Sequence, residues 1–82
     1  MTPHEIRDYL RREPFKPFRM HTAVGRSYDV RYPDEALVLA TRVNVALRES
    51  PESEFPQHVE RLPLAEIVRI EVLQGGSPQE SS

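Results

Sequence analysis

The sequence predicts a mainly β domain with one N-terminal α-helix, folded as a small antiparallel barrel or a strongly bent sheet of five or six strands. Two observations predict this class. Apolar residues recur at helical spacing only before residue 14, and from Phe18 onward they alternate with polar residues in short runs. A chain of 82 residues is long enough for one domain, which we expect over residues 1–74. Residues 75–82, rich in Gly, Ser and Gln, are expected to form a disordered tail.

The expected helix covers residues 3–13. Thr2 and Glu5 have the spacing of a capping box, and a proline stands between them at the first helical position. Pro14 ends the helix, because the residue before a proline resists helical geometry. The apolar face that would pack on the rest of the domain consists of Ile6, Tyr9 and Leu10.

The strands are predicted from runs in which apolar and polar residues alternate. These runs are residues 18–24, 28–32, 42–48, 58–62 and 67–73, and residues 36–40 form a further, continuously apolar run. Gly25 marks a hairpin turn between the first two runs. Residues 36–40 are apolar at both parities, which predicts a central strand covered on both faces. Residues 49–57 are acidic and contain proline, which predicts a mobile loop, and residues 63–66 predict a single helical turn.

Two stretches resemble the motifs of Sm-like and SH3-like small barrels. Residues 24–39 resemble the first Sm motif, a glycine turn followed by an apolar strand, and residues 62–72 resemble the second, a strand, a tight turn and a strand. The chain also resembles short uncharacterised bacterial proteins that share the Glu-Pro-Phe and Pro-Phe of residues 13–18 and the spaced Leu and Ile of residues 62–71. The resemblance implies a small barrel that associates edge to edge.

The Sm-like resemblance does not extend to the RNA site. Bacterial RNA-binding proteins of this kind carry a Lys-His pair in the turn of the second motif, where this chain has Pro63 and Leu64, whose side chains have no hydrogen-bond donor. A net charge of −2 also argues against general nucleic-acid binding. RNA or nucleotide binding therefore stays the alternative function, with Tyr28 and Tyr32 as rings that could stack on bases.

The chain lacks arrangements typical of catalytic or metal sites. Without cysteine it has no thiolate nucleophile and no cysteine-bound zinc. The three histidines, His4, His21 and His58, are not at ligand spacing, and no serine lies in a strand-to-helix elbow. We therefore expect no enzymatic activity, no cofactor and no metal ion.

The function that the sequence favours is a non-catalytic protein-interaction or self-assembling module. A small domain has a limited core, and open strand edges can accept a partner. We expect a protein partner, a homo-oligomer, no membrane association and a cytoplasmic location, because there is no cysteine, no signal peptide and no long apolar run. Ten of the 11 basic residues are Arg, which forms bidentate contacts. The candidate interaction surface comprises Arg7, Arg11, Arg12, Arg42, Val43, Val45 and Val59.

Overall fold

The N-terminal helix begins with the predicted capping box. The computed structural model describes residues 1–48 and 54–73, and its helix α1 covers Pro3–Arg11. The backbone N–H of Glu5 donates to Oγ1 of Thr2 at 3.3 Å, and the Glu5 carboxylate accepts from the Thr2 N–H at 2.9 Å. The helix ends two residues earlier than expected, because Arg12 already has extended backbone and Pro14 excludes helical geometry just beyond it.

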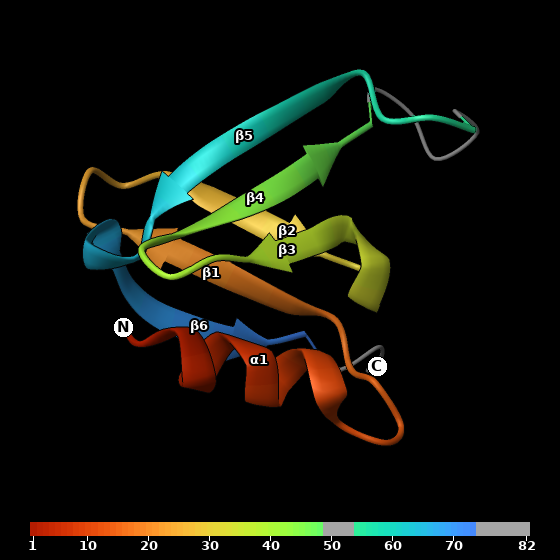
Figure 1. The fold of residues 1–82 in the computed structure, drawn as a ribbon, viewed down its shortest axis with the longest axis horizontal. Coiled ribbons are helices and arrows are strands. Elements are labelled where there is room, and N and C mark those ends of the chain that lie inside the picture. The colour runs from red at the N-terminus through yellow and green to blue at the C-terminus, as the bar shows by residue number, and fades with distance from the viewer. Residues whose placement is uncertain (49–53, 74–82) are drawn as a thin grey trace, which may run out of the picture.

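Six strands follow the helix and form two three-stranded antiparallel sheets, of order β2-β1-β6 and β3-β4-β5 (Figure 1). Their bounds are β1 Phe18–Thr22, β2 Ser27–Val30, β3 Ala36–Val38, β4 Arg42–Leu47, β5 His58–Pro63 and β6 Ile67–Val72. The mainly β fold with one N-terminal helix is thus confirmed. The strand pairs in the described part of the chain do not close the two sheets into a barrel.

Short turns connect the strands at the expected places. Gly25, in the β1–β2 hairpin, has φ of 85°, a conformation that glycine adopts without steric cost. The 3-10 helix η1, Pro33–Glu35, leads from the first sheet to the second, and η2, Leu64–Glu66, leads back, so the predicted helical turn before the last strand is confirmed. The loop predicted over residues 49–57 lies outside the described residues at 49–53, and the tail predicted at 75–82 does so entirely.

The prediction that residues 36–40 form a central strand is wrong. β3 has only three residues and is an edge strand that pairs with β4 alone. Leu37 is 59% exposed on its outer face. The central strands are β1 and β4. An apolar run at both parities is compatible with either position, because single exposed apolar side chains are common on protein surfaces.

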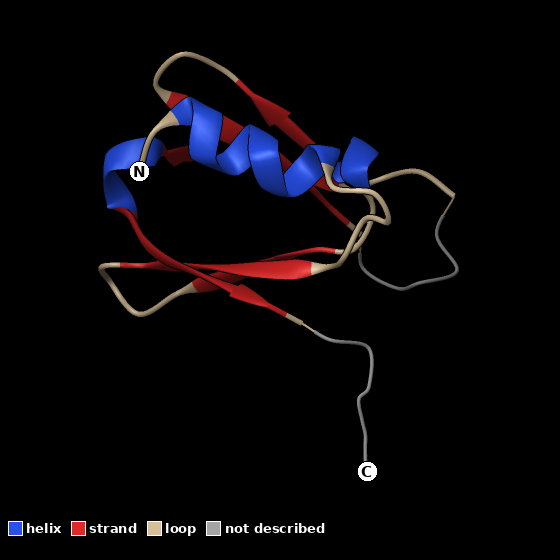
Figure 2. Ribbon diagram, turned by 90° about the horizontal axis from the view of Figure 1, so that it is seen from below, coloured by secondary structure: helices blue, strands red, loops and turns tan. Residues whose placement is uncertain are grey.

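The core lies between the two sheets and under α1. It consists of Ile6, Phe18, Met20, Val30, Val43, Val45, Leu62, Leu64 and Ile67. The Tyr9 ring packs 5.4 Å from that of Phe18, and α1 also contacts β3 and lies beside Ile70 of β6. The helix therefore covers the side of the molecule where β3 and β6 form the edges (Figures 1 and 2). The side where β2 faces the end of β4 has no such cover, and the candidate site lies there.

Candidate functional site

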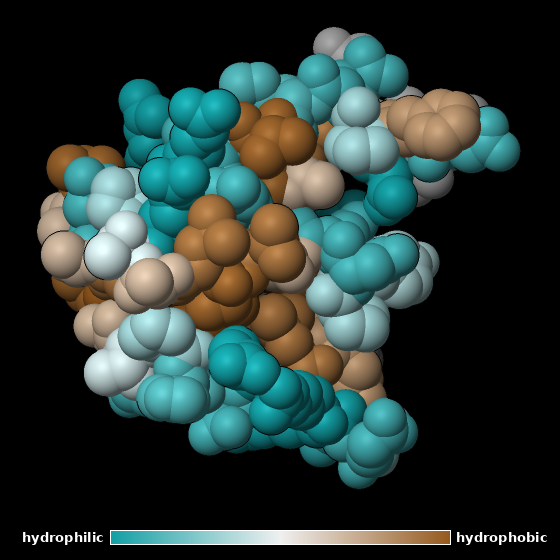
Figure 3. All heavy atoms as spheres, viewed as in Figure 1, coloured by the Kyte–Doolittle hydropathy of each residue, from teal (hydrophilic) through white to brown (hydrophobic). Residues whose placement is uncertain are grey.

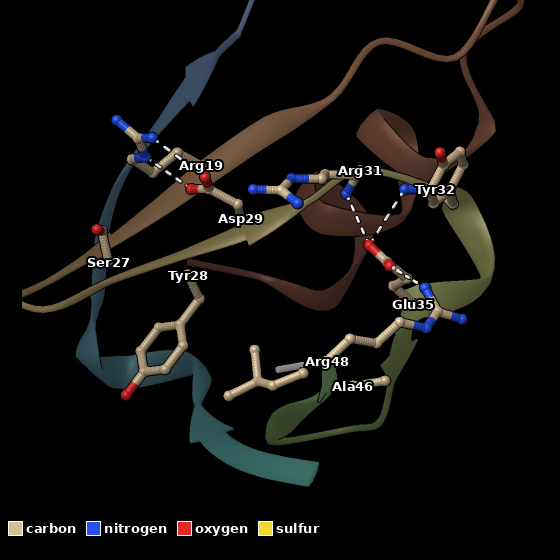
Figure 4. A pocket seen from close by; sticks show the side chains of 10 residues that line it. Arg19, Ser27, Tyr28, Asp29, Arg31, Tyr32, Glu35, Ala46 and Arg48 are labelled. Atoms are coloured by element: carbon tan, nitrogen blue, oxygen red, sulfur yellow. Dashed lines mark hydrogen bonds and ion pairs between the residues drawn. The ribbon is translucent and has the colours of Figure 1, made fainter. Parts of the chain in front are cut away.

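A pocket of about 580 Å³ opens between β2 and the C-terminal end of β4. Figure 4 shows its lining side chains. They belong to Arg19, residues 27–29, 31 and 32, Glu35 and residues 46–48. We call this pocket the β2–β4 groove. Its volume is within the range of pockets that hold ligands.

The groove exists because neither β2 nor the end of β4 has a paired strand on the side that faces the groove. β2 is the outer strand of its sheet and pairs only with β1. β3 pairs with β4 only as far as Ala36, which lies opposite Val45. Leu47 and Arg48 therefore extend past the end of β3, and the chain crosses between the sheets through η1 without filling the gap.

The free edge of β2 presents backbone hydrogen-bonding groups to the groove. In antiparallel strands, the N–H and C=O groups of successive residues point alternately towards the partner and away from it. The Thr22 N–H donates to the Arg26 carbonyl at 2.9 Å. Hydrogen-bonded pairs with β1 recur at every second residue of β2, so they fall at Tyr28 and Val30. The backbone groups of Ser27 and Asp29 therefore point away from β1, towards the open edge.

Glu35 ends this open edge and joins the two walls. Its Oε1 accepts the backbone N–H of Arg31 at 2.9 Å and that of Tyr32 at 3.3 Å, so it takes the place that a neighbouring strand would have there. Its Oε2 accepts from Nη1 of Arg48 at 2.6 Å. Glu35 is buried, and these contacts offset the cost of burying its charge. The carboxylate thus holds the end of β2 and the end of β4 in one arrangement.

The second carboxylate of the groove is also fully engaged. Nε of Arg19 donates to Oδ1 of Asp29 at 2.6 Å, and Nη2 donates to Oδ2 at 3.1 Å, a bidentate pair across the β1–β2 hairpin. This hydrogen bond is the main reason why the pKa of Asp29 is lowered, and the nearby charge of Arg31 lowers the pKa further. The same pair raises the pKa of Arg19.

The remaining capacity of the groove is therefore cationic and hydrogen-bond donating. Three arginines and two carboxylates line it. Arg31 is exposed, forms no ion pair with any described residue, and extends along β2 towards Asp29 (Figure 4). Nε of Arg48 is buried and has no hydrogen-bond partner among the described residues. A ligand that supplies an anionic acceptor would complement Arg31 and the exposed part of the Arg48 side chain.

The candidate surface predicted from the sequence is not assembled. Arg7 and Arg11 are exposed on α1, and the Arg12 guanidinium lies 4.2 Å over the Tyr9 ring. Val59 is 53% exposed on β5, which lies on the side of the molecule away from α1 (Figure 1). Arg42 is exposed at the start of β4.

Val43 and Val45 require a correction, because both side chains are fully buried in the core. They alternate with Asn44 on β4, and their side chains face inward between the sheets. Their place in the predicted interaction surface is therefore wrong, and β4 has a neighbouring strand on each side. An inward-facing strand residue cannot contribute to an exposed surface.

Apart from Tyr28 and Tyr32, which the RNA-binding alternative named, the residues of the β2–β4 groove were not predicted as a site. One signal was available: Arg19 and Asp29 are equally distant from Val24 in the turn, so a hairpin centred on Val24 places them side by side. No local signal connects Glu35 with Arg48, because their contact depends on how the second sheet packs over the first.

The described residues contain no group of three or more His, Asp or Glu that could hold a metal ion. No helix in the same part of the chain is long and apolar enough to cross a membrane. No protein-family model matches the chain, and no curated protein or solved structure matches it. The Sm-like and SH3-like resemblance therefore stays a prediction.

Proposed function

We propose that this protein is a non-catalytic protein-interaction module that receives an extended segment of a partner protein along the open edge of β2. The observation that carries the proposal is the groove beside that edge, into which the backbone groups of Ser27 and Asp29 are directed. Exposed edge strands bind extended peptides by adding a strand to the sheet. Main-chain hydrogen bonds then supply affinity, and the walls of the groove supply specificity.

The chemistry of the groove supports binding rather than catalysis. A general base that works near neutral pH needs a pKa close to that pH, whereas the pKa of Asp29 is lowered by Arg19. Glu35 uses both of its oxygens to hold backbone amides and Arg48. Both carboxylates therefore act as structural acceptors that shape the groove.

An Sm-like or SH3-like relationship, with the barrel left open between the two sheets, remains part of the proposal. The pairing of β1 with β6 and the short η2 turn before β6 support it. In such a domain the same small core carries several short edges, which favours binding by strand addition.

Nucleotide or single-stranded RNA binding is the second candidate function. Tyr32 is 60% exposed and lies in the groove with Arg31 and Arg48, and rings beside cations bind nucleotides by stacking and charge. Tyr28, in contrast, is half-buried and packs against the core. The alternating N–H and C=O groups of a strand edge match a peptide backbone and not a phosphodiester chain, which favours the first proposal.

The protein also self-assembles in this proposal, with a second copy of the same chain as the partner. Leu37 and Val59 are both more than half exposed. Their register opposite Asn44 and Ala46 places them on the outer face of the second sheet. Figure 3 shows apolar side chains gathered in the middle of one view, over β3. We propose that the homo-oligomer uses this face.

The proposed function can be tested with a library of short random linear peptides selected on the immobilised protein. Peptides that are enriched should slow amide hydrogen exchange at Ser27 and Asp29, because these groups point to the open edge. Ser27→Pro should abolish binding, since it removes one edge N–H from the first residue of β2, where proline is tolerated. Ser27→Ala is the matched control and should bind normally. If no peptide is enriched, or if protection appears only on α1, the proposal is wrong.

A further inference from the structure

We infer that the segment bound along β2 is acidic, and that the Arg31 guanidinium anchors one of its side-chain carboxylates with Arg48 as a second donor. The inference rests on the proposed function and adds the chemistry of the partner. It follows from the balance of charge in the groove, from the position of Arg31 directly after β2, and from the apolar residues of the opposite wall.

The two carboxylates of the β2–β4 groove do not provide acceptors for all the guanidinium donors of its three arginines. Arg19 is occupied by Asp29 through two hydrogen bonds, and Glu35 occupies one nitrogen of Arg48. Arg31 has no ionic partner among the described residues, and the Arg48 side chain is still 28% exposed beside its contact with Glu35. A ligand that provides carboxylate acceptors here gains charge-assisted hydrogen bonds from these guanidinium groups.

The strand geometry brings a bound segment to these donors. Arg31 follows Asp29 by two positions, so both residues have the same parity along the chain. A partner residue opposite Asp29 places its side chain on the same face as that of Asp29. The partner residue two positions further along the bound segment has its side chain on the same face and lies beside Arg31. Because the Arg31 N–H is already bound to Glu35, backbone pairing ends at Asp29, and at Arg31 only side-chain contact is possible.

The opposite wall adds a requirement for apolar side chains. Ala46, Leu47 and the half-buried ring of Tyr28 line the groove, and Leu47 and Tyr28 also pack against the core. Alternate residues of an extended segment point to opposite faces of a sheet. A segment in which acidic and apolar residues alternate therefore fits both the arginines and this wall.

Other clusters of cations do not offer the same site. On the outer face of β1, Arg19 is bound to Asp29, and the His21 ring lies 2.9 Å from a Glu71 oxygen, so both of these groups already have partners. Arg7 and Arg11 are exposed on α1 but do not line either of the two pockets described. Arg61 is exposed on the edge strand β5, but it lines neither pocket. The β2–β4 groove combines an open strand edge, a pocket and an arginine without an ion pair among the described residues.

The test compares peptide selections on the wild type, Arg31→Glu, Arg31→Lys and Arg42→Glu, with all synthetic peptides amidated so that only side chains supply carboxylates. Peptides enriched on the wild type should alternate Asp or Glu with apolar residues. Arg31→Glu should weaken their binding about fivefold or more, which is the effect of losing an ion pair of about 1 kcal/mol. Arg31→Lys should retain part of the affinity. Arg42→Glu makes the same change of charge on an exposed β4 residue outside the groove and should have no effect.

The outcomes separate this inference from the proposed function. Peptides that protect Ser27 and Asp29 from exchange but show no preference for acidic residues would overturn the inference and leave the function intact. Equal affinity of the wild type and Arg31→Glu for an acidic peptide would also overturn it. If no peptide binds, and a single-stranded oligoribonucleotide binds the wild type but not Arg31→Glu, both proposals are wrong and the nucleotide alternative replaces them.

Discussion

Glu35 and Arg48, 13 positions apart in the chain, meet at 2.6 Å and connect the crossover between the two sheets to the end of β4. The other carboxylate oxygen of Glu35 binds the amides that follow β2. One side chain thus fixes the separation of the two walls of the β2–β4 groove. The shape of the groove is for this reason a property of the folded domain, whether or not a partner is present.

Replacing Glu35 by Gln should lower the free energy of unfolding by about 1–3 kcal/mol, because the partly buried Arg48 loses its ionic partner. The side-chain oxygen of Gln can still accept the amides of Arg31 and Tyr32, so the fold should be retained. Urea denaturation measures the change. Asp34→Asn, at the exposed neighbouring position, is the control and should stay within about 0.5 kcal/mol of the wild type. Equal midpoints for Glu35→Gln and the wild type would contradict the role assigned to Glu35.

Truncating Ile6 to Ala should destabilise the domain by about 2–5 kcal/mol, because the side chain is fully buried and its removal leaves a cavity. This residue anchors α1 over the side of the molecule where β3 and β6 form the edges. His4→Ala, on the exposed side of the same helix, should change stability by less than about 0.5 kcal/mol. Thermal and denaturant unfolding of the two variants would test the docking of α1, and similar losses in both would contradict it.

The Arg19–Asp29 pair should make stability depend on pH in the acidic range. Because the pKa of Asp29 in the folded state is lowered below its ordinary value of 3.8, the pair stabilises the fold above that value. Its contribution is lost as the pH falls through the folded-state pKa. Asp29→Asn should therefore cost about 1 kcal/mol or less near neutral pH, given the partial exposure of both side chains.

The difference between Asp29→Asn and the wild type should vanish at acidic pH. Denaturant midpoints measured from neutral pH down to pH about 2 would show the two curves converging below the ordinary pKa of an aspartate. A difference that persists unchanged at the lowest pH would show that the stabilisation does not arise from the charge of Asp29.

The proposed homo-oligomer predicts a mass above that of the monomer in light scattering behind a sizing column. Val59→Glu and Leu37→Glu should dissociate it, because each places a charge on the outer face of the second sheet. Arg12→Glu changes α1 instead and should leave the mass unchanged. A mass near 9.5 kDa for the wild type at tens of micromolar would rule out the oligomer, and dissociation by Arg12→Glu alone would move the interface to the helix. Val45 is unsuitable for this test, because a charge at a fully buried position would destabilise the fold itself.

The residues that form each helix and strand could be predicted from the sequence because their signals are local. Thr2 and Glu5 are three residues apart and cap the helix within a single turn. Phe18, Met20 and Thr22 alternate with polar residues, and this period of two determines which side chains of β1 face the core. Gly25 similarly marks the hairpin turn. Each feature depends on a few consecutive residues, so no knowledge of the distant chain was needed.

The sequence by itself therefore determined the helix, the approximate strand positions and the inward-facing residues of β1. Only the tertiary structure decided that β3 is an edge strand, that the two sheets do not close into a barrel, and that Glu35 meets Arg48. The physical reason is that an apolar run can be buried equally well at several places in a sheet. Which strands become neighbours, and which charges meet across the gap between them, depends on the packing of the whole core around α1.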